Sequence, residues 1–131
     1  MIFTASIDGY LKFWKKGQVG IEFIKTFRAH VGRITGLALT PNEERLASVC
    51  ETEQSVKLFD VLNFDVIHFM RLGFAPGECE FVNKIASFTP VLAIAEVAKT
   101  AASAGEGAEA EPGTNPESEQ TGAIRLLKVE Q

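Results

Sequence analysis

Two histidines and two cysteines are the side chains of this 131-residue sequence that are best suited to chemistry. His30, His68, Cys50 and Cys79 are of the types that bind zinc, and a cysteine beside a histidine can act as a nucleophile. Their separations match no compact zinc-ligand pattern, and nothing in the sequence supplies a base for a cysteine nucleophile. We therefore expect buried free thiols, with no metal, no cofactor and no catalytic residue in this chain.

The two histidines are expected to have structural roles. His30 follows Ala29 at the start of a turn, and we interpret it as a buried histidine that holds this turn. His68 lies in the alternating run 66–69, where it is expected to face solvent.

The composition is that of an ordinary globular domain, with 46% hydrophobic and 23% charged residues. The formal net charge is −4, and residues 99–121 account for all of it, so the remainder is neutral. The chain thus lacks the basic surface that attracts nucleic acids or anionic membranes. It has no apolar run long enough to span a membrane and no signal-peptide pattern at residues 1–4, which predicts an intracellular, reducing compartment.

An internal repeat predicts the fold. The same order of turn, aliphatic, basic and apolar residues occurs at 9–15, 54–60 and 122–128. Trp14 and Phe59 are 45 positions apart, and Phe59 and Leu127 are again 45 apart when the 23 residues 99–121 are left out. A period near 45 with strand-like content is typical of a propeller blade.

Four strand-like runs fill one period. Residues 21–27 are rich in β-branched and aromatic side chains, and 33–40 alternate with both faces uncharged after Arg33. Residues 46–50 and 55–61 supply the next two runs. We therefore predict an all-β fold, an incomplete β-propeller of about two and a half four-stranded antiparallel blades.

The predicted units are 1–16 as the second half of a blade, 17–62 as a complete blade, and 63–131 as a third blade. Residues 99–121 are rich in Ala, Gly and Glu and contain no aromatic side chain. We interpret this segment as a disordered acidic insert in a hairpin turn, with a helix as the alternative. It could bind a basic partner, but a solvated loop is the simpler interpretation.

Parts of the sequence resemble a WD repeat. The hairpin 4–14 resembles the closing hairpin of such a repeat, and 56–60 resembles the same strand with Phe59 in place of tryptophan. Ala29-His30 stands where WD repeats carry a Gly-His pair. The structural WD positions that this resemblance implies are Ser6, Asp8, Trp14, His30, Phe59 and Asp60.

WD repeats commonly hold a hydrogen-bonded tetrad of histidine, serine or threonine, turn aspartate and tryptophan. The resemblance implies that Ser6, Asp8 and Trp14 are three members of one tetrad in the first blade. It implies that His30 starts an incomplete tetrad in the second, because Phe59 lacks an indole N–H. Trp14, Phe13 and Tyr10 could form an aromatic binding platform. We instead expect Trp14 and Phe13 to pack between blades, whereas Tyr10 and Lys12 could be exposed.

Longer stretches resemble the amino-terminal propeller of cyclophilin-type peptidyl-prolyl isomerases that contain WD repeats. These stretches lie at 8–16, 20–23, 27–30, 59–65 and 72–80. Members of that family carry a cyclophilin domain after the propeller and associate with spliceosomes in the nucleus. No part of this sequence resembles a cyclophilin active site, with its catalytic arginine in a hydrophobic groove.

The resemblance implies a protein-interaction scaffold, a fragment of a nuclear, spliceosome-associated isomerase that does not itself catalyse. Two alternatives remain, a role defined by the isomerase activity of its parent and a stand-alone small β protein that binds others. The expected partners are proteins, with no direct nucleic acid and no membrane. Because an incomplete propeller leaves apolar flanks and an unpaired edge, we also expect marginal stability and self-association.

Overall fold

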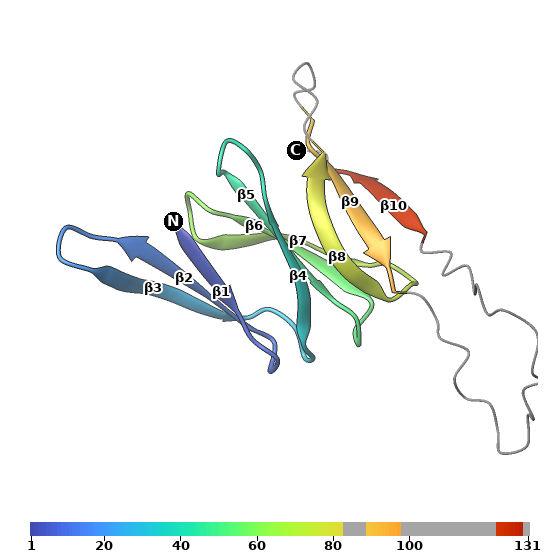
Figure 1. Ribbon diagram of the computed structural model, residues 1–131, viewed down its shortest axis with the longest axis horizontal. Coiled ribbons are helices and arrows are strands. Elements are labelled where there is room, and N and C mark those ends of the chain that lie inside the picture. Colours follow the sequence, from blue (N-terminus) through green and yellow to red (C-terminus); the bar gives the residue numbers. More distant parts are fainter. Residues whose placement is uncertain (83–88, 98–122, 130–131) are drawn as a thin grey trace, which may run out of the picture.

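The computed structural model describes residues 1–82, 89–97 and 123–129, and all regular structure in these ranges is β-strand (Figure 1). The ten strands are β1 (Ile2–Ala5), β2 (Tyr10–Lys16), β3 (Ile21–Arg28), β4 (Ile34–Leu39), β5 (Arg45–Cys50), β6 (Ser55–Asp60), β7 (Asp65–Arg71), β8 (Pro76–Val82), β9 (Val91–Glu96) and β10 (Ile124–Lys128). The described residues include no helix with the length and hydrophobicity needed to cross a membrane. The predicted insert at 99–121 lies outside the described residues.

The strands form three antiparallel sheets that stand side by side in chain order (Figure 1). The first sheet has the order β1-β2-β3, the second β4-β5-β6-β7 and the third β8-β9-β10. Every pairing within them is antiparallel. The prediction of an all-β fold made of antiparallel propeller blades is confirmed.

The sheets divide the chain at different residues from the units predicted as 1–16 and 17–62. Strand β3 pairs with β2, and β7 pairs with β6, so the first two sheets end at Arg28 and Arg71. The turns before these strands are short, and Gly17 N–H donates to the carbonyl of Gly20 at 2.7 Å. A tight turn returns the chain beside the strand it has just left, and the following strand therefore stays in the same sheet.

Two apolar clusters join the three sheets. One lies between the first and second sheets and has Phe13 at its centre, with its ring 5.1 Å from that of Phe3 and 6.0 Å from that of Phe59. The other lies between the second and third sheets and includes Leu58 and Leu92. Because each sheet buries one face against the next, the interfaces between sheets supply most of the buried apolar surface.

The same backbone register recurs in all three sheets. Trp14 pairs with Ile2, Phe59 with Leu46 and Leu127 with Leu92. The ladder slips at matching places too, between Phe13 and Trp14 in the first sheet and between Leu58 and Phe59 in the second. The repeat detected in the sequence is therefore a repeat of sheet geometry.

Candidate functional site

The buried histidine predicted to hold a turn lies where the first two sheets meet. His30 belongs to the connection between β3 and β4, and its backbone N–H donates to the carbonyl of Gly9 at 3.1 Å. Gly9 has a φ of +85°, and a Cβ there would lie 1.9 Å from the carbonyl oxygen of His30. The turn between β1 and β2 can approach His30 this closely only because residue 9 is glycine.

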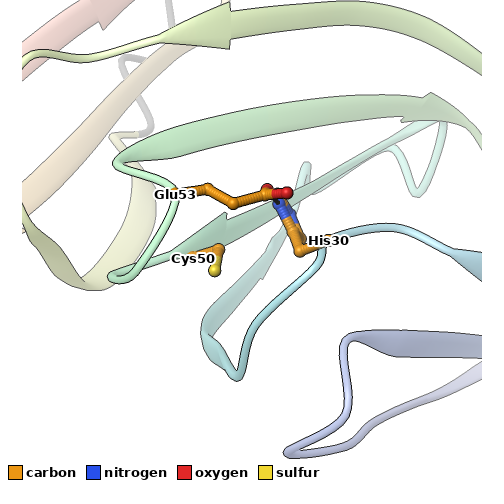
Figure 2. A group of neighbouring side chains, drawn as sticks. All are labelled: His30, Cys50 and Glu53. Carbon is orange, nitrogen blue, oxygen red and sulfur yellow. Dashed lines mark hydrogen bonds and ion pairs between the residues drawn. The ribbon is translucent and has the colours of Figure 1, made fainter.

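The imidazole of His30 is held by groups of the second sheet. Its Nδ1 lies 2.8 Å from Oε2 of Glu53, in the turn between β5 and β6, and 3.1 Å from Oγ of Ser55. Its Nε2 lies 2.8 Å from Oγ of Ser48, a fully buried residue of β5. Figure 2 shows the Glu53 side chain reaching from its turn to the imidazole.

The partners determine which ring nitrogen carries the proton. An ionised carboxylate only accepts, so Nδ1 carries the hydrogen and donates it to Glu53. Nε2 then accepts the hydroxyl proton of Ser48. Glu53 also accepts the backbone N–H of Val31 at 2.8 Å and the hydroxyl of Ser55 at 2.9 Å. Each polar group of the network therefore has a partner.

Burial and hydrogen bonding set the charges of this network. Burial lowers the pKa of His30 below its ordinary value of 6.5, and the nearby Glu53 carboxylate only partly opposes this effect. Burial also acts to raise the pKa of Glu53, but the hydrogen bonds from Val31 and His30 outweigh it, so that pKa is lowered. At neutral pH the site holds a neutral imidazole against an ionised carboxylate.

Cys50, one of the four residues of zinc-binding type, lies beside this network. The ligand atoms of His30, Cys50 and Glu53 all fall within 4.8 Å of one another (Figure 2). A metal would have to displace Glu53 from Nδ1 or Ser48 from Nε2, since both ring nitrogens already have partners. The geometry is therefore that of a hydrogen-bonded network, not of a preformed metal centre.

His68 and Cys79, the other two residues of zinc-binding type, lie on other strands. His68 is an exposed residue of β7, and Cys79 lies on β8. Burial raises the pKa of the Cys79 thiol to about 12, so this group is a protonated thiol at neutral pH and a poor nucleophile.

The residues implied as a tetrad in the first sheet form two separate contacts. Trp14 Nε1 donates to Oγ1 of Thr4 at 2.9 Å, and the Ser6 hydroxyl donates to the Asp8 carboxylate within the turn. The hydrogen bond from Ser6 lowers the pKa of Asp8. Ser6 and Trp14 thus bind different partners, and sequence reasoning missed Thr4 as the acceptor of the indole N–H.

Strand alternation alone could not have distinguished these two candidates. Thr4 and Ser6 are two residues apart, so period-two alternation places both on the same side of the chain. The register opposes Thr4 to Lys12 and Ile2 to Trp14, and this brings Thr4 beside the indole. Ser48 is the equivalent residue of the second sheet, opposite Lys57, and it was missed for the same reason.

Phe59 and Asp60 take no part in the His30 network. Phe59 is fully buried, and its ring lies 5.2 Å from that of Phe27. Asp60 holds the turn between β6 and β7 by accepting the backbone N–H of Leu62 and the side-chain amide of Asn63. The Asn63 hydrogen bond is the main cause that lowers the pKa of Asp60.

The flanking aromatic residues differ in their surroundings. Phe13 is buried between the first two sheets, as expected. Trp14 lies on the opposite face of β2, where its ring packs against Phe23 at 5.4 Å and no described sheet covers it. A surface depression of about 570 Å³ extends over this face, and it is lined by Trp14, Tyr10 and Lys12.

Comparisons with known proteins agree with these features. Over 105 residues, 80% of its length, the chain is 43% identical to "Peptidylprolyl isomerase domain and WD repeat-containing protein 1" of Mus musculus, and equally to that of Homo sapiens. It is 42% identical over 93 residues to "Peptidyl-prolyl cis-trans isomerase CYP71" of Arabidopsis thaliana. The chain is thus similar to part of proteins that are named for WD repeats and for peptidyl-prolyl isomerases.

The chain spans about 15% of the length of the curated relatives it matches. Its fold is similar to the β-propeller domain of Cps50 (Swd1) from "Myceliophteria_thermophila", with a TM-score of 0.56 and 19% identity. That similarity covers 70% of this chain and 28% of the other. No family model matches the sequence.

Proposed function

We propose that this WD-repeat chain is a non-catalytic scaffold that binds proteins of nuclear splicing complexes. The names of its relatives combine a peptidyl-prolyl isomerase with WD repeats, and the part matched here folds as propeller sheets. The isomerase activity of those relatives would then belong to another part of their length. Propellers bind other proteins through the rims and faces of their sheets.

The polar groups of the His30 network already have hydrogen-bond partners, and this observation supports a non-catalytic role. Catalysis by proton transfer needs a group that can reach a substrate, whereas both nitrogens of His30 are engaged and its side chain is buried. Cys79, with its raised pKa, offers no thiolate. His30 and Glu53 are therefore occupied in holding the fold.

A prolyl isomerase assay on the full 131-residue chain tests this part of the proposal. We expect the cis–trans rate of a proline-containing peptide to equal the uncatalysed rate, with a cyclophilin as the positive control. A rate above background that disappears in the His30→Gln variant would overturn the non-catalytic role.

The partner class is tested by affinity capture from nuclear extract, together with the location of a tagged chain in cells. We expect nuclear signal and enrichment of splicing proteins. The control is Phe13→Asp, which places a charge in the fully buried core between the first two sheets and should abolish a fold-dependent surface. Equal capture by both forms, or a chain that stays outside the nucleus, would contradict the proposal.

A further inference from the structure

The free edge of the second sheet is apolar, which is unusual for an unpaired strand. Strand β7 is the last strand in the order β4-β5-β6-β7, so no described strand pairs with its outer edge. All of its residues are exposed, and they include Val66, Ile67, Phe69 and Met70. Proteins protect such edges with charged residues, proline or a covering segment, so an apolar free edge marks a surface that another chain can meet.

Further sheets of the same repeat would leave this edge open. The sheets of this chain meet through their faces, in apolar clusters that contain Phe13 and Leu58. A sheet added beside the first or the third would stack on a face in the same way, and it would not reach the outer edge of β7. The Arg71 end of β7 faces the first sheet, because Arg71 pairs with Ser55, which binds His30. That sheet already includes β3, the strand that matches β7.

The hydrogen-bond pattern shows which backbone groups point to the free edge. The N–H of Leu72 donates to the carbonyl of Gln54 at 2.7 Å, so these two residues are a hydrogen-bonded pair of the antiparallel ladder. Bonded and non-bonded pairs alternate in such a ladder. Counting along the register from Leu72, Phe69 and Arg71 fall at non-bonded positions. Their backbone N–H and C=O groups therefore point outward, where an added strand can bind them.

The side chains beside these backbone groups are cationic. Arg71 is exposed, and none of the described carboxylates forms an ion pair with it. Lys57 of β6 lies opposite Phe69, with its Nζ 5.5 Å from the centre of that ring. The acidic residue of this strand, Asp65, stands at its other end. An incoming strand with a carboxylate would therefore meet complementary charge at Arg71.

We propose that β7 is a docking strand for an extended segment of a partner protein, which pairs with the edge at Phe69 and Arg71. The segment places an apolar side chain against Phe69 and a carboxylate beside Arg71 and Lys57. A second copy of this chain fits less well, because two β7 strands paired through these residues would bring the cations of both copies together. This inference rests on the protein-binding part of the proposed function, but not on the partners being splicing proteins.

Selection from a library of displayed random peptides on the full 131-residue chain tests the proposal. We expect the selected peptides to combine aspartate or glutamate with apolar residues. They should bind Arg71→Glu about tenfold or more weakly than the wild type, because a charge-assisted hydrogen bond is lost. Arg28→Glu is the matched control, since it makes the same charge change at an exposed position of β3, and it should bind like the wild type.

Hydrogen exchange separates strand pairing from contacts of side chains alone. We expect a bound peptide to slow exchange at the backbone N–H groups of Phe69 and Arg71, and to leave that of Leu72 unchanged because it is already bonded. A library without binders, equal loss of binding in Arg28→Glu, or protection that spares β7 would overturn the proposal. If capture from nuclear extract succeeds while no selected peptide depends on Arg71, the scaffold role stands and this docking site is overturned.

Discussion

Thr4 and Ser48 occupy the same register position in neighbouring sheets, each opposite a lysine, yet their hydroxyl groups bind different partners. Thr4 accepts the indole N–H of Trp14, whereas Ser48 donates to Nε2 of His30. Thr4 is exposed and Ser48 is fully buried. In the third sheet the equivalent residue is Ile94, which is part of an apolar cluster. The same register position therefore holds an exposed hydrogen bond in the first sheet, a buried hydrogen bond in the second and an apolar contact in the third.

The first prediction compares these two hydroxyl groups. Ser48→Ala leaves Nε2 of His30 buried without a donor, and we expect it to lower the free energy of unfolding by about 1–3 kcal/mol. Thr4→Ala removes an exposed hydrogen bond and should cost less than about 1 kcal/mol. Urea denaturation of both variants checks this. An equal loss in the two variants would show that burial does not control the contribution of this position.

The second prediction concerns acid stability. The pKa of His30 is lowered in the folded state, so the unfolded chain binds its proton first as the pH falls. Stability is thus complete above the ordinary pKa of 6.5 and decreases as the pH falls below it. The lowered pKa of Glu53 adds a further loss below its ordinary value of 4.5.

Thermal melting between about pH 7.5 and about pH 5.5 measures the contribution of His30. We expect the Tm of the wild-type chain to fall across this interval. His30→Gln should have a lower Tm at neutral pH but a flatter profile, because its side chain does not titrate. His68→Gln is the matched control, since His68 is exposed, and it should keep the wild-type profile. A His30→Gln profile as steep as that of the wild type would exclude His30 as the origin.

The sequence predicted the repeat and the strands well because both depend on local patterns. Alternation and apolar runs predicted the strands of the second sheet, and the 45-residue period placed Trp14, Phe59 and Leu127 in one register position. The sheet boundaries could not be obtained in this way. They depend on hydrogen bonds formed after the turns at 17–20 and 61–64, and periodicity alone does not reveal these bonds.

The partners within the site were harder to predict. His30 was recognised from its place in the repeat, but its contacts come from residues 18 to 25 positions away. A strand can pair in several registers, and a slip of one residue turns every side chain to the other face. The sequence therefore indicated a buried histidine, while the choice of Ser48 and Ser55 as its partners required the three-dimensional register.

The third prediction uses two glycines that share a left-handed backbone but differ in their surroundings. Gly9 and Gly73 have φ of +85° and +73°, but a Cβ would strike the His30 carbonyl at Gly9 and meet nothing within 4 Å at Gly73. We expect Gly73→Ala to cost about 1–2 kcal/mol from backbone strain alone. Gly9→Ala should cost more, because the turn must also move away from His30. Equal losses in chemical denaturation would mean that the contact contributes nothing.

The last prediction tests whether the interfaces between sheets hold the fold together. Phe13 is fully buried, with its ring within 6.1 Å of the rings of Phe3, Phe27, Phe59 and Phe64. Phe13→Ala opens a cavity where the first two sheets meet and should lower the free energy of unfolding by about 3–5 kcal/mol.

Phe23→Ala is the matched control for Phe13→Ala, because Phe23 lies in the same sheet and is 54% exposed. We expect Phe23→Ala to lower the free energy of unfolding by less than about 1 kcal/mol. Urea denaturation of both variants measures the difference between them. If Phe13→Ala were as mild as Phe23→Ala, the first two sheets would not be stabilised by their shared core.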